Sequence, residues 1–298
     1  MSAARKKPAA TPQDWAYRHH PAFEEDRKRD ALRQAEEPLW RRSRLTQFAL
    51  FAVVLILWPL PIINPIKLLV VLCHELSHVA AAYLTGGVVF GIAIDPGGAG
   101  ATLGMGGNEL FIVSMGYVGN LLIGLLLYVL IAAWEPGEVW FVLCLFCGVS
   151  PTLGWFNDFT NFFGAGTLIV MILGTFLLRP EWKKFILRWT AISCCLYPVI
   201  DVLSEVLWRQ ANRLQVSNRT VASDVARLAQ LTGLSAPLIA AVWILAGLGA
   251  VLFMINWSAR YEARGEVRRS LLRRQPPQDY VRALYASDRN NPPRYRVG

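Results

Sequence analysis

Residues 66–85 read IKLLVVLCHELSHVAAAYLT, and this stretch decides the fold. A helix of about 20 apolar residues is long enough to cross the roughly 30 Å hydrocarbon core of a bilayer. The cluster His74, Glu75 and His78 places ionisable groups within it. The stretch therefore predicts a transmembrane helix that carries a polar group within its apolar interior.

The middle of the chain repeats this pattern of long apolar runs, separated by Pro, Gly, Asn or charged residues. The candidate spans are residues 46–63, 66–85, 109–134, 139–156, 161–178, 185–208 and 236–257. They predict an all-α polytopic membrane protein, because a helix satisfies its own backbone hydrogen bonds in lipid. A soluble protein with buried helices is the alternative. Two observations argue against a soluble protein. Several runs exceed the usual length of a core helix, and only 17% of the residues are charged.

The net charge of +9 belongs to the two ends of the chain. The first 45 residues sum to +4, residues 258–298 sum to +6, and the residues between them sum to −1. This distribution argues against a basic surface for nucleic acid. It is typical of cytoplasmic segments that flank a membrane and face its lipids.

The number of spans follows from the same charges. Two basic ends on the cytoplasmic side require an even number of crossings. Residues 139–156 are the weakest candidate, because Gly148, Pro151 and Gly154 interrupt them. We expect six transmembrane helices, or seven, with 139–156 as the broken or re-entrant segment.

We divide the chain into a charged arm over residues 1–45, a membrane-embedded domain over 46–257 and a basic tail over 258–298. The composition of the arm and the tail favours disorder or a surface helix. Residues 86–108 are rich in Gly and contain a run of strand composition, so they predict either a small β-hairpin or a connecting loop. The edge of such a hairpin could hold an unwound peptide by strand addition.

The motif His74-Glu75-Leu76-Ser77-His78 has the HExxH spacing of zinc hydrolases. Residues i and i+4 share a face of a helix, so both imidazoles can bind one Zn²⁺ ion. Glu75 projects close to that face, where its carboxylate can take a proton from a water at the metal. The alternative is a satisfied polar patch that packs helices together. Ionisable groups inside a span are expensive, which favours a functional site.

A catalytic zinc site usually has three protein ligands and a water, so a third ligand is expected. The only other histidines lie in the charged arm, and the candidates are therefore the acidic residues Asp158, Asp201 and Glu205. We favour Asp201, which lies in an apolar stretch three residues after Pro198, a helix-disturbing residue. Asp158 lies in a polar break where a helix cap is the more natural role, and it is the alternative ligand.

Three stretches resemble a known family. Residues 74–87, HELSHVAAAYLTGG, resemble the zinc-binding helix of the site-2-protease superfamily of intramembrane metallopeptidases, in its M50B-like branch. Gly116-Tyr117-Val118-Gly119-Asn120 is similar to the Gly-Pro-x-x-Asn element of that superfamily. Residues 197–202, YPVIDV, are similar in position to its Leu-Asp-Gly element, with Val202 in place of the glycine. Residues 223–233, SDVARLAQLTG, look like a helical stretch seen late in that branch.

The resemblance covers about residues 66–245 and implies an intramembrane zinc metalloprotease that acts on transmembrane protein substrates. It implies His74, His78 and Asp201 as ligands of Zn²⁺, Glu75 as the catalytic base, and Asn120 with Gly116 at the substrate. The alternative role of Asn120 is a hydrogen bond between packed helices. The alternative function is a membrane protein that uses the same ligands for metal transport or as a silent scaffold. Glu75 argues against it, because a simple metal site needs no carboxylate between its histidines.

Overall fold

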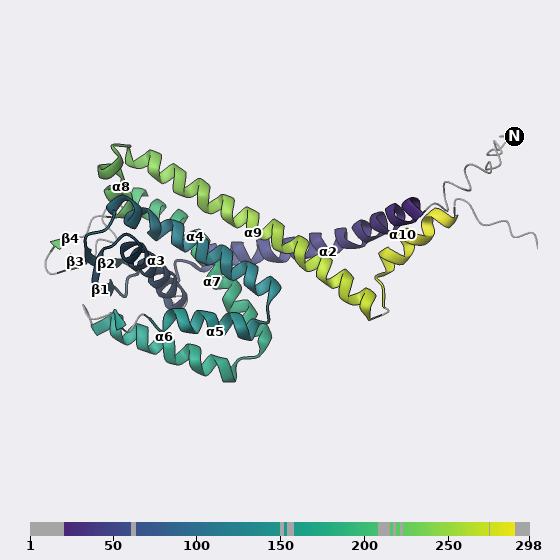
Figure 1. Cartoon of the computed structure of the whole chain (residues 1–298), viewed down its shortest axis with the longest axis horizontal. Helices are drawn as coiled ribbons and strands as arrows, with labels where there is room; N and C mark the ends of the chain where they lie inside the picture. Colours follow the sequence, from purple (N-terminus) through teal and green to yellow (C-terminus); the bar gives the residue numbers. More distant parts are fainter. Residues whose placement is uncertain are drawn as a thin grey trace, which may run out of the picture. The chain divides into compact units, whose positions relative to one another are not determined.

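The computed structural model describes residues 21–60, 64–149, 152–153, 158–207, 215–216, 219–220, 223–273 and 275–289. These residues form helices and two short antiparallel hairpins (Figure 1). The helices are α2 (Pro21–Leu57), α3 (Asn64–Leu84), α4 (Glu109–Ala133), α5 (Pro136–Cys147), α6 (Asp158–Leu177), α7 (Pro180–Leu207), α8 (Asp224–Thr232), α9 (Ala236–Leu272) and α10 (Gln278–Arg289). The strands are β1 (Val88–Ile94), β2 (Gly100–Met105), β3 (Gln215–Val216) and β4 (Arg219–Thr220). The described residues divide into two compact units, one within residues 47–258 and the other formed by the described residues before 47 and after 258.

Five of the described helices, namely α3, α4, α6, α7 and α9, are long and apolar enough to cross a membrane. The predicted polytopic all-α fold is thereby confirmed. The expected run at 139–156 is the twelve-residue helix α5, which is too short to be counted among them. The expected run at 46–63 forms the apolar end of α2, and residues 61–63 lie outside the described part of the chain. The described residues thus contain five helices of membrane length, where six or seven spans were expected.

Helix α3 lies at the centre of the larger unit, in contact with α4, α7 and the β1–β2 hairpin (Figure 1). In α3, 78% of the most apolar 18-residue window is buried within the protein. In α6, only 28% of the corresponding window is buried. An apolar helix buried on nearly all sides is a core helix, whereas one that exposes most of its surface faces lipid. The polar cluster of α3 is therefore enclosed by protein.

Small residues let the central helices approach closely. A Cβ atom at Gly124 of α4 would lie 2.6 Å from Cys195 Sγ and 2.7 Å from the Ala191 carbonyl oxygen, both on α7. A Cβ atom at Gly247 of α9 would lie 3.0 Å from the Cys195 carbonyl oxygen. Such contacts are typical of packing between helices in membranes, where dispersion replaces the hydrophobic effect.

The β1–β2 hairpin confirms the first of the two expectations for residues 86–108. Its strands pair antiparallel, with a register shift between Val89 and Gly91. The outer edge of β1 is covered, since the Ile92 amide donates to the Leu153 carbonyl and the Ile94 amide donates to the Thr160 hydroxyl. The hairpin is thus joined to Leu153 and to the first turn of α6.

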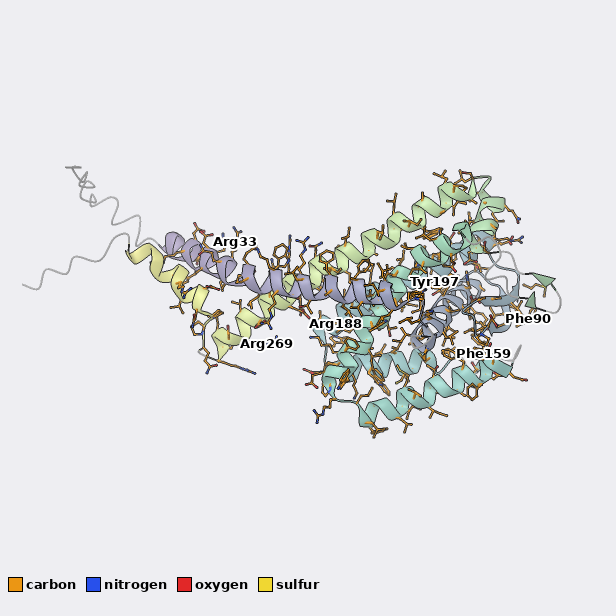
Figure 2. The ribbon with its side chains drawn as sticks, turned by 180° about the vertical axis from the view of Figure 1, so that it is seen from behind. Arg33, Phe90, Phe159, Arg188, Tyr197 and Arg269 are labelled. Carbon is orange, nitrogen blue, oxygen red and sulfur yellow. The ribbon has the colours of Figure 1, made fainter. Side chains whose placement is uncertain are left out.

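The smaller unit contains the described parts of the arm and of the tail, which are helical. Ala31 and Ala35 of α2 are buried, as are Ala263 and Val267 of α9. The Ser43 hydroxyl donates to Glu262 at 2.7 Å, which joins α2 to α9. Basic side chains such as Arg33 and Arg269 are labelled on these two helices in Figure 2.

Replacing Gly124 with Ala should destabilise the larger unit by about 1–3 kcal/mol, because the added methyl group meets the α7 backbone. The helix propensity of Ala offsets only part of this cost. Thermal unfolding in detergent, followed by tryptophan fluorescence, measures the effect. Gly166→Ala is the matched control, since no atom lies within 4 Å of a Cβ at that position. Equal melting temperatures for the two variants would contradict the proposed contact.

Candidate metal centre

Helix α3 brings the three polar residues of the HExxH motif together. His74 and His78 are 4% and 6% exposed, and their Nε2 atoms lie 3.1 Å apart. Together with Glu75, which is also buried, they form a group whose ligand atoms all lie within 4.8 Å of one another. The i, i+4 spacing therefore produces the expected geometry, with both imidazoles directed to one point.

Asp224 supplies the carboxylate at this point. Its Oδ2 atom lies 2.8 Å from His74 Nε2 and 3.2 Å from His78 Nε2. Asp224 is the first residue of α8, and the preceding residue, Ser223, caps that helix by accepting from the Ala226 amide. A carboxylate at a helix N-terminus is also stabilised by the helix dipole. One oxygen thus lies against both of the imidazole nitrogens.

Helix α8 is held in this position by packing and by an ion pair. Val225 and Leu228 are buried, and α8 packs against α4. The Arg227 guanidinium pairs with Glu109 in the first turn of α4, with an Nε to Oε1 distance of 2.6 Å. Burial would raise the pKa of the Asp224 carboxyl, but His78 and His74 hold that pKa well below its usual range. Asp224 is therefore a carboxylate at neutral pH.

Helix α4 orients the imidazoles from the other side. The Nδ1 atom of His78 lies 2.7 Å from the Ile112 carbonyl oxygen, to which only an N–H can donate. This hydrogen bond places a proton on Nδ1, so Nε2 is the nitrogen that could bind a metal, as in most histidine ligands. A Cβ atom at Gly116 would lie 2.5 Å from His74 Cε1 and from His78 Nε2, so only glycine fits there. Gly116, predicted to lie at the substrate, thus contacts the two histidines, and its substrate-binding role stays a prediction.

Strand β2 positions Glu75. The Thr102 hydroxyl lies 2.7 Å from Glu75 Oε2 and 3.1 Å from the Glu75 carbonyl oxygen, and it donates to the carboxylate. Gly100, at the start of the same strand, lies directly against the Glu75 carboxylate, and a Cβ atom there would collide with it. The hairpin therefore holds this carboxylate beside the pair of imidazoles.

Asp201, the favoured third ligand, lies elsewhere. Its Oδ2 accepts a hydrogen bond from the Tyr117 hydroxyl at 2.7 Å, and Tyr197 also hydrogen-bonds to it. The rings of these two tyrosines pack on His74, with centroid separations of 5.2 and 5.1 Å. The tyrosines thus stand between Asp201 and the imidazoles. Where the sequence favoured Asp201, the structure places Asp224 against the two nitrogens.

The remaining predicted residues occupy other places. Asn120 is fully buried, and its amide donates to the Val70 carbonyl of α3 at 3.4 Å, which is a contact between packed helices. Its substrate-binding role stays a prediction. Asp158 is exposed in the first turn of α6, as expected for a residue near a helix end. Glu205 lies in the last turn of α7, and its side chain lies outside the described residues.

Neither Asp224 nor Thr102 was predicted from the sequence to be part of the site. The candidate ligands were the acidic residues of the later spans, whereas Asp224 begins a short amphipathic helix. One signal for it was present, because Ser223 followed by an acidic residue is a typical helix start. Thr102 carried no such signal, since its contact with Glu75 depends on how the hairpin packs.

The donor set fits zinc. Two imidazole nitrogens and one carboxylate oxygen are a usual ligand set of catalytic zinc, which leaves the fourth position to water or substrate. The Nε2 atoms of His74 and His78 and the Oδ2 atom of Asp224 lie within 3.2 Å of one another. His74, His78 and Asp224 are therefore the residues that would hold the ion.

Residues 47–254 match the family described as Peptidase M50B-like. The chain belongs to this family. The M50B-like family is the site-2-protease family, and the predicted resemblance is confirmed. Searches of curated proteins and of solved structures found no match.

Family membership agrees with the composition of the helices. Together with the five apolar helices of membrane length, it identifies an integral, multi-pass membrane protein. The matched range contains α3, α4, α8 and the β1–β2 hairpin, so every residue of the candidate centre lies within the M50B-like part of the chain.

Replacing Gly116 with Ala should weaken metal binding about tenfold or more, because the added methyl group would displace both imidazoles. Zinc titration of the purified protein, read by mass spectrometry of the bound metal, measures the effect. Gly249→Ala of α9 is the control, since a Cβ atom there meets no neighbour within 4 Å. An unchanged zinc affinity in Gly116→Ala would show that this glycine does not shape the centre.

Proposed function

We propose that the chain is a zinc-dependent endopeptidase that hydrolyses peptide bonds of membrane-embedded protein substrates. The observation that carries the proposal is the convergence of His74, His78 and Asp224 beside Glu75 inside a membrane-spanning unit. Membership of the M50B-like family supports a metallopeptidase of the site-2-protease type. A silent metal site would not need Glu75 buried beside the histidines and held by Thr102.

Bound zinc would polarise the scissile carbonyl and acidify a water, as in other zinc hydrolases. Glu75 takes a proton from the attacking water and later gives one to the leaving amine as the C–N bond breaks. Thr102 keeps the carboxylate in place for both steps. Ile112 holds the imidazole of His78 in the tautomer that leaves its Nε2 lone pair free for the metal.

The β1–β2 hairpin offers a place for the substrate backbone. Within the described part of the chain, no backbone hydrogen bond joins the outer edge of β2 to another element. An extended peptide can pair with such an edge, and a helical substrate must unwind before its peptide bonds become accessible. Thr102 and Gly100 of β2 contact Glu75, so a peptide added there would lie beside the catalytic carboxylate.

Replacing Glu75 with Gln should lower the cleavage rate by about 10²–10⁴-fold, because the amide cannot accept the proton of the water. The zinc content should be retained, since Glu75 is not one of the three ligands. The assay incubates the zinc-loaded protein in vesicles with a pool of single-span peptides and identifies products by mass spectrometry. Glu266→Gln, an exposed carboxylate of α9, is the control. A Glu75→Gln protein that cleaves at the native rate would refute the proposed function.

Replacing Asp224 with Ala should weaken zinc binding by more than about 100-fold, since even residues outside the ligand set cost about 10–100-fold. Asp201→Asn should keep zinc, because an amide oxygen can still accept the hydrogen bond of Tyr117. Zinc titration of both variants measures the difference. The opposite ranking would make Asp201 the third ligand and would contradict the role of Asp224.

A further inference from the structure

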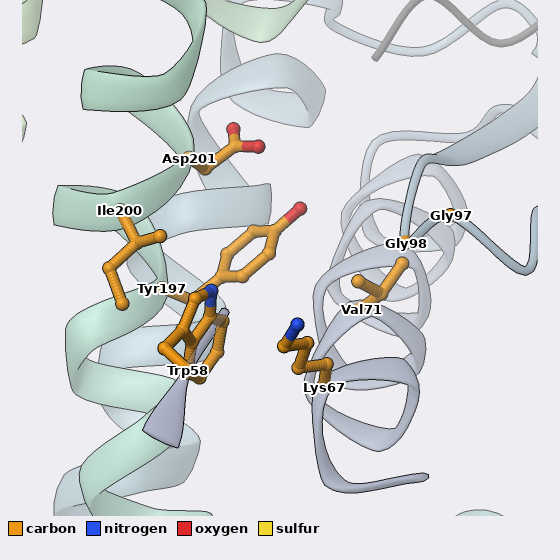
Figure 3. Close-up of a pocket in the computed structure, with 8 residues that line it drawn as sticks. All are labelled: Trp58, Lys67, Val71, Gly97, Gly98, Tyr197, Ile200 and Asp201. Atoms are coloured by element: carbon orange, nitrogen blue, oxygen red, sulfur yellow. The ribbon is translucent and has the colours of Figure 1, made fainter. Parts of the chain in front are cut away.

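A cavity of about 160 Å³ lies beside the metal centre, between α3 and α7. Four segments line it: the residues after α2, helix α3, the turn of the β1–β2 hairpin, and helix α7 (Figure 3). The lining residues are Trp58, Lys67, Val71, Gly97, Gly98, Tyr197, Ile200 and Asp201. The volume is several times the roughly 30 Å³ that a water molecule occupies, so the cavity can accept a side chain.

The cavity adjoins the groups proposed to act in catalysis. The ring of Tyr197 packs on His74 with a centroid separation of 5.1 Å. Val71 lies one helical turn before Glu75 on the same face of α3, and a Cβ atom at Gly100 would meet both of them. Lys67 lies one further turn along this face. The lining of the cavity thus follows α3 from Lys67 to Val71, one turn before Glu75.

The two charges in the cavity have different surroundings. Asp201 accepts hydrogen bonds from the hydroxyls of Tyr117 and Tyr197. The Lys67 ammonium lies 5.8 Å from the centre of the Trp58 ring. No ion pair or hydrogen bond of Lys67 is found among the described residues, and Asp201 does not pair with it. Lys67 is a partly exposed residue in the first turn of α3, and a lysine near the end of a span keeps its ammonium where an anion can reach it. The cavity therefore contains a cation that is ready to bind one.

We propose that this cavity is a substrate subsite in which Lys67 binds the carboxylate of an Asp or Glu side chain. The inference rests on the proposed peptidase function and names the class of substrate that it selects. Two turns of α3 separate Lys67 from Glu75, which is about 12 Å along the helix axis. An extended chain covers that distance in about four residues. The acidic residue is thus within about four positions of the cleaved bond.

The other anion available to Lys67 is a lipid phosphate. We favour the substrate because residues that line the cavity adjoin the groups proposed to act in catalysis. Val71 and Tyr197 each line it and contact the centre or its neighbours. A bound phosphate would affect the cleavage of every peptide equally, whereas a subsite affects only peptides that carry an acidic residue. A comparison of acidic with neutral peptides therefore separates a substrate carboxylate from a lipid phosphate.

The test compares acidic and neutral substrates. Zinc-loaded native protein in phosphatidylcholine vesicles cleaves a pool of single-span peptides with randomised residues, and mass spectrometry identifies each product. We expect Asp and Glu to be enriched at least about fivefold over Asn and Gln at one position within four residues of the cut. Lys67→Met should reduce this ratio to about one. Lys67→Glu should reverse it in favour of Lys and Arg, and Lys67→Arg should preserve it.

The possible outcomes distinguish the proposed subsite from the proposed peptidase function. A ratio that is the same in the native, Met and Glu variants overturns the subsite, while cleavage that depends on Glu75 leaves the proposed function intact. A uniform loss of cleavage in Lys67→Met, with the ratio preserved, also overturns the subsite and points to lipid or to folding. Products that form equally in Glu75→Gln, or no products from the native protein, overturn the peptidase function and the subsite with it.

Discussion

The interaction on which the site depends is the approach of one carboxylate to two imidazoles within an apolar unit. Burying a polar group is costly unless another polar group meets it. The Asp224 oxygen lies within 3.2 Å of both Nε2 atoms. The His78 ring is oriented in turn by the Ile112 carbonyl, and the neighbouring Glu75 by Thr102. Four separate elements therefore contribute to one polar cluster, and the packing of α3, α4, α8 and β2 has to be mutually consistent.

Much of the fold followed from the sequence. The length of the apolar runs predicted a polytopic helical membrane protein, because the bilayer thickness fixes the length of a spanning helix. The number of spans was less secure, since α5 and the apolar end of α2 are both shorter than the five helices of membrane length. Residues 86–108 were expected to form either a hairpin or a connecting loop, because their composition is compatible with both.

The site followed from the sequence only where its residues are neighbours in the chain. The helical period alone places His74 and His78 side by side, whereas Asp224 is 150 residues from His74. No spacing rule reaches that far, and the search favoured Asp201 because it is acidic and lies within an apolar run. Two tyrosines instead satisfy Asp201, and their rings pack on His74. The search for a buried acid thus identified a residue near the centre but not the one that contacts the nitrogens.

The position of Asp224 late in the chain also has a consequence for biosynthesis. A ribosome makes both histidines and the neighbouring glutamate long before it reaches the helix that carries the aspartate, and domains fold progressively as they emerge. Until α8 docks on α4 through Arg227 and Glu109, the two imidazoles have no carboxylate between them. A partly synthesised chain therefore lacks Asp224 at the candidate centre until α8 has been made and has packed against α4.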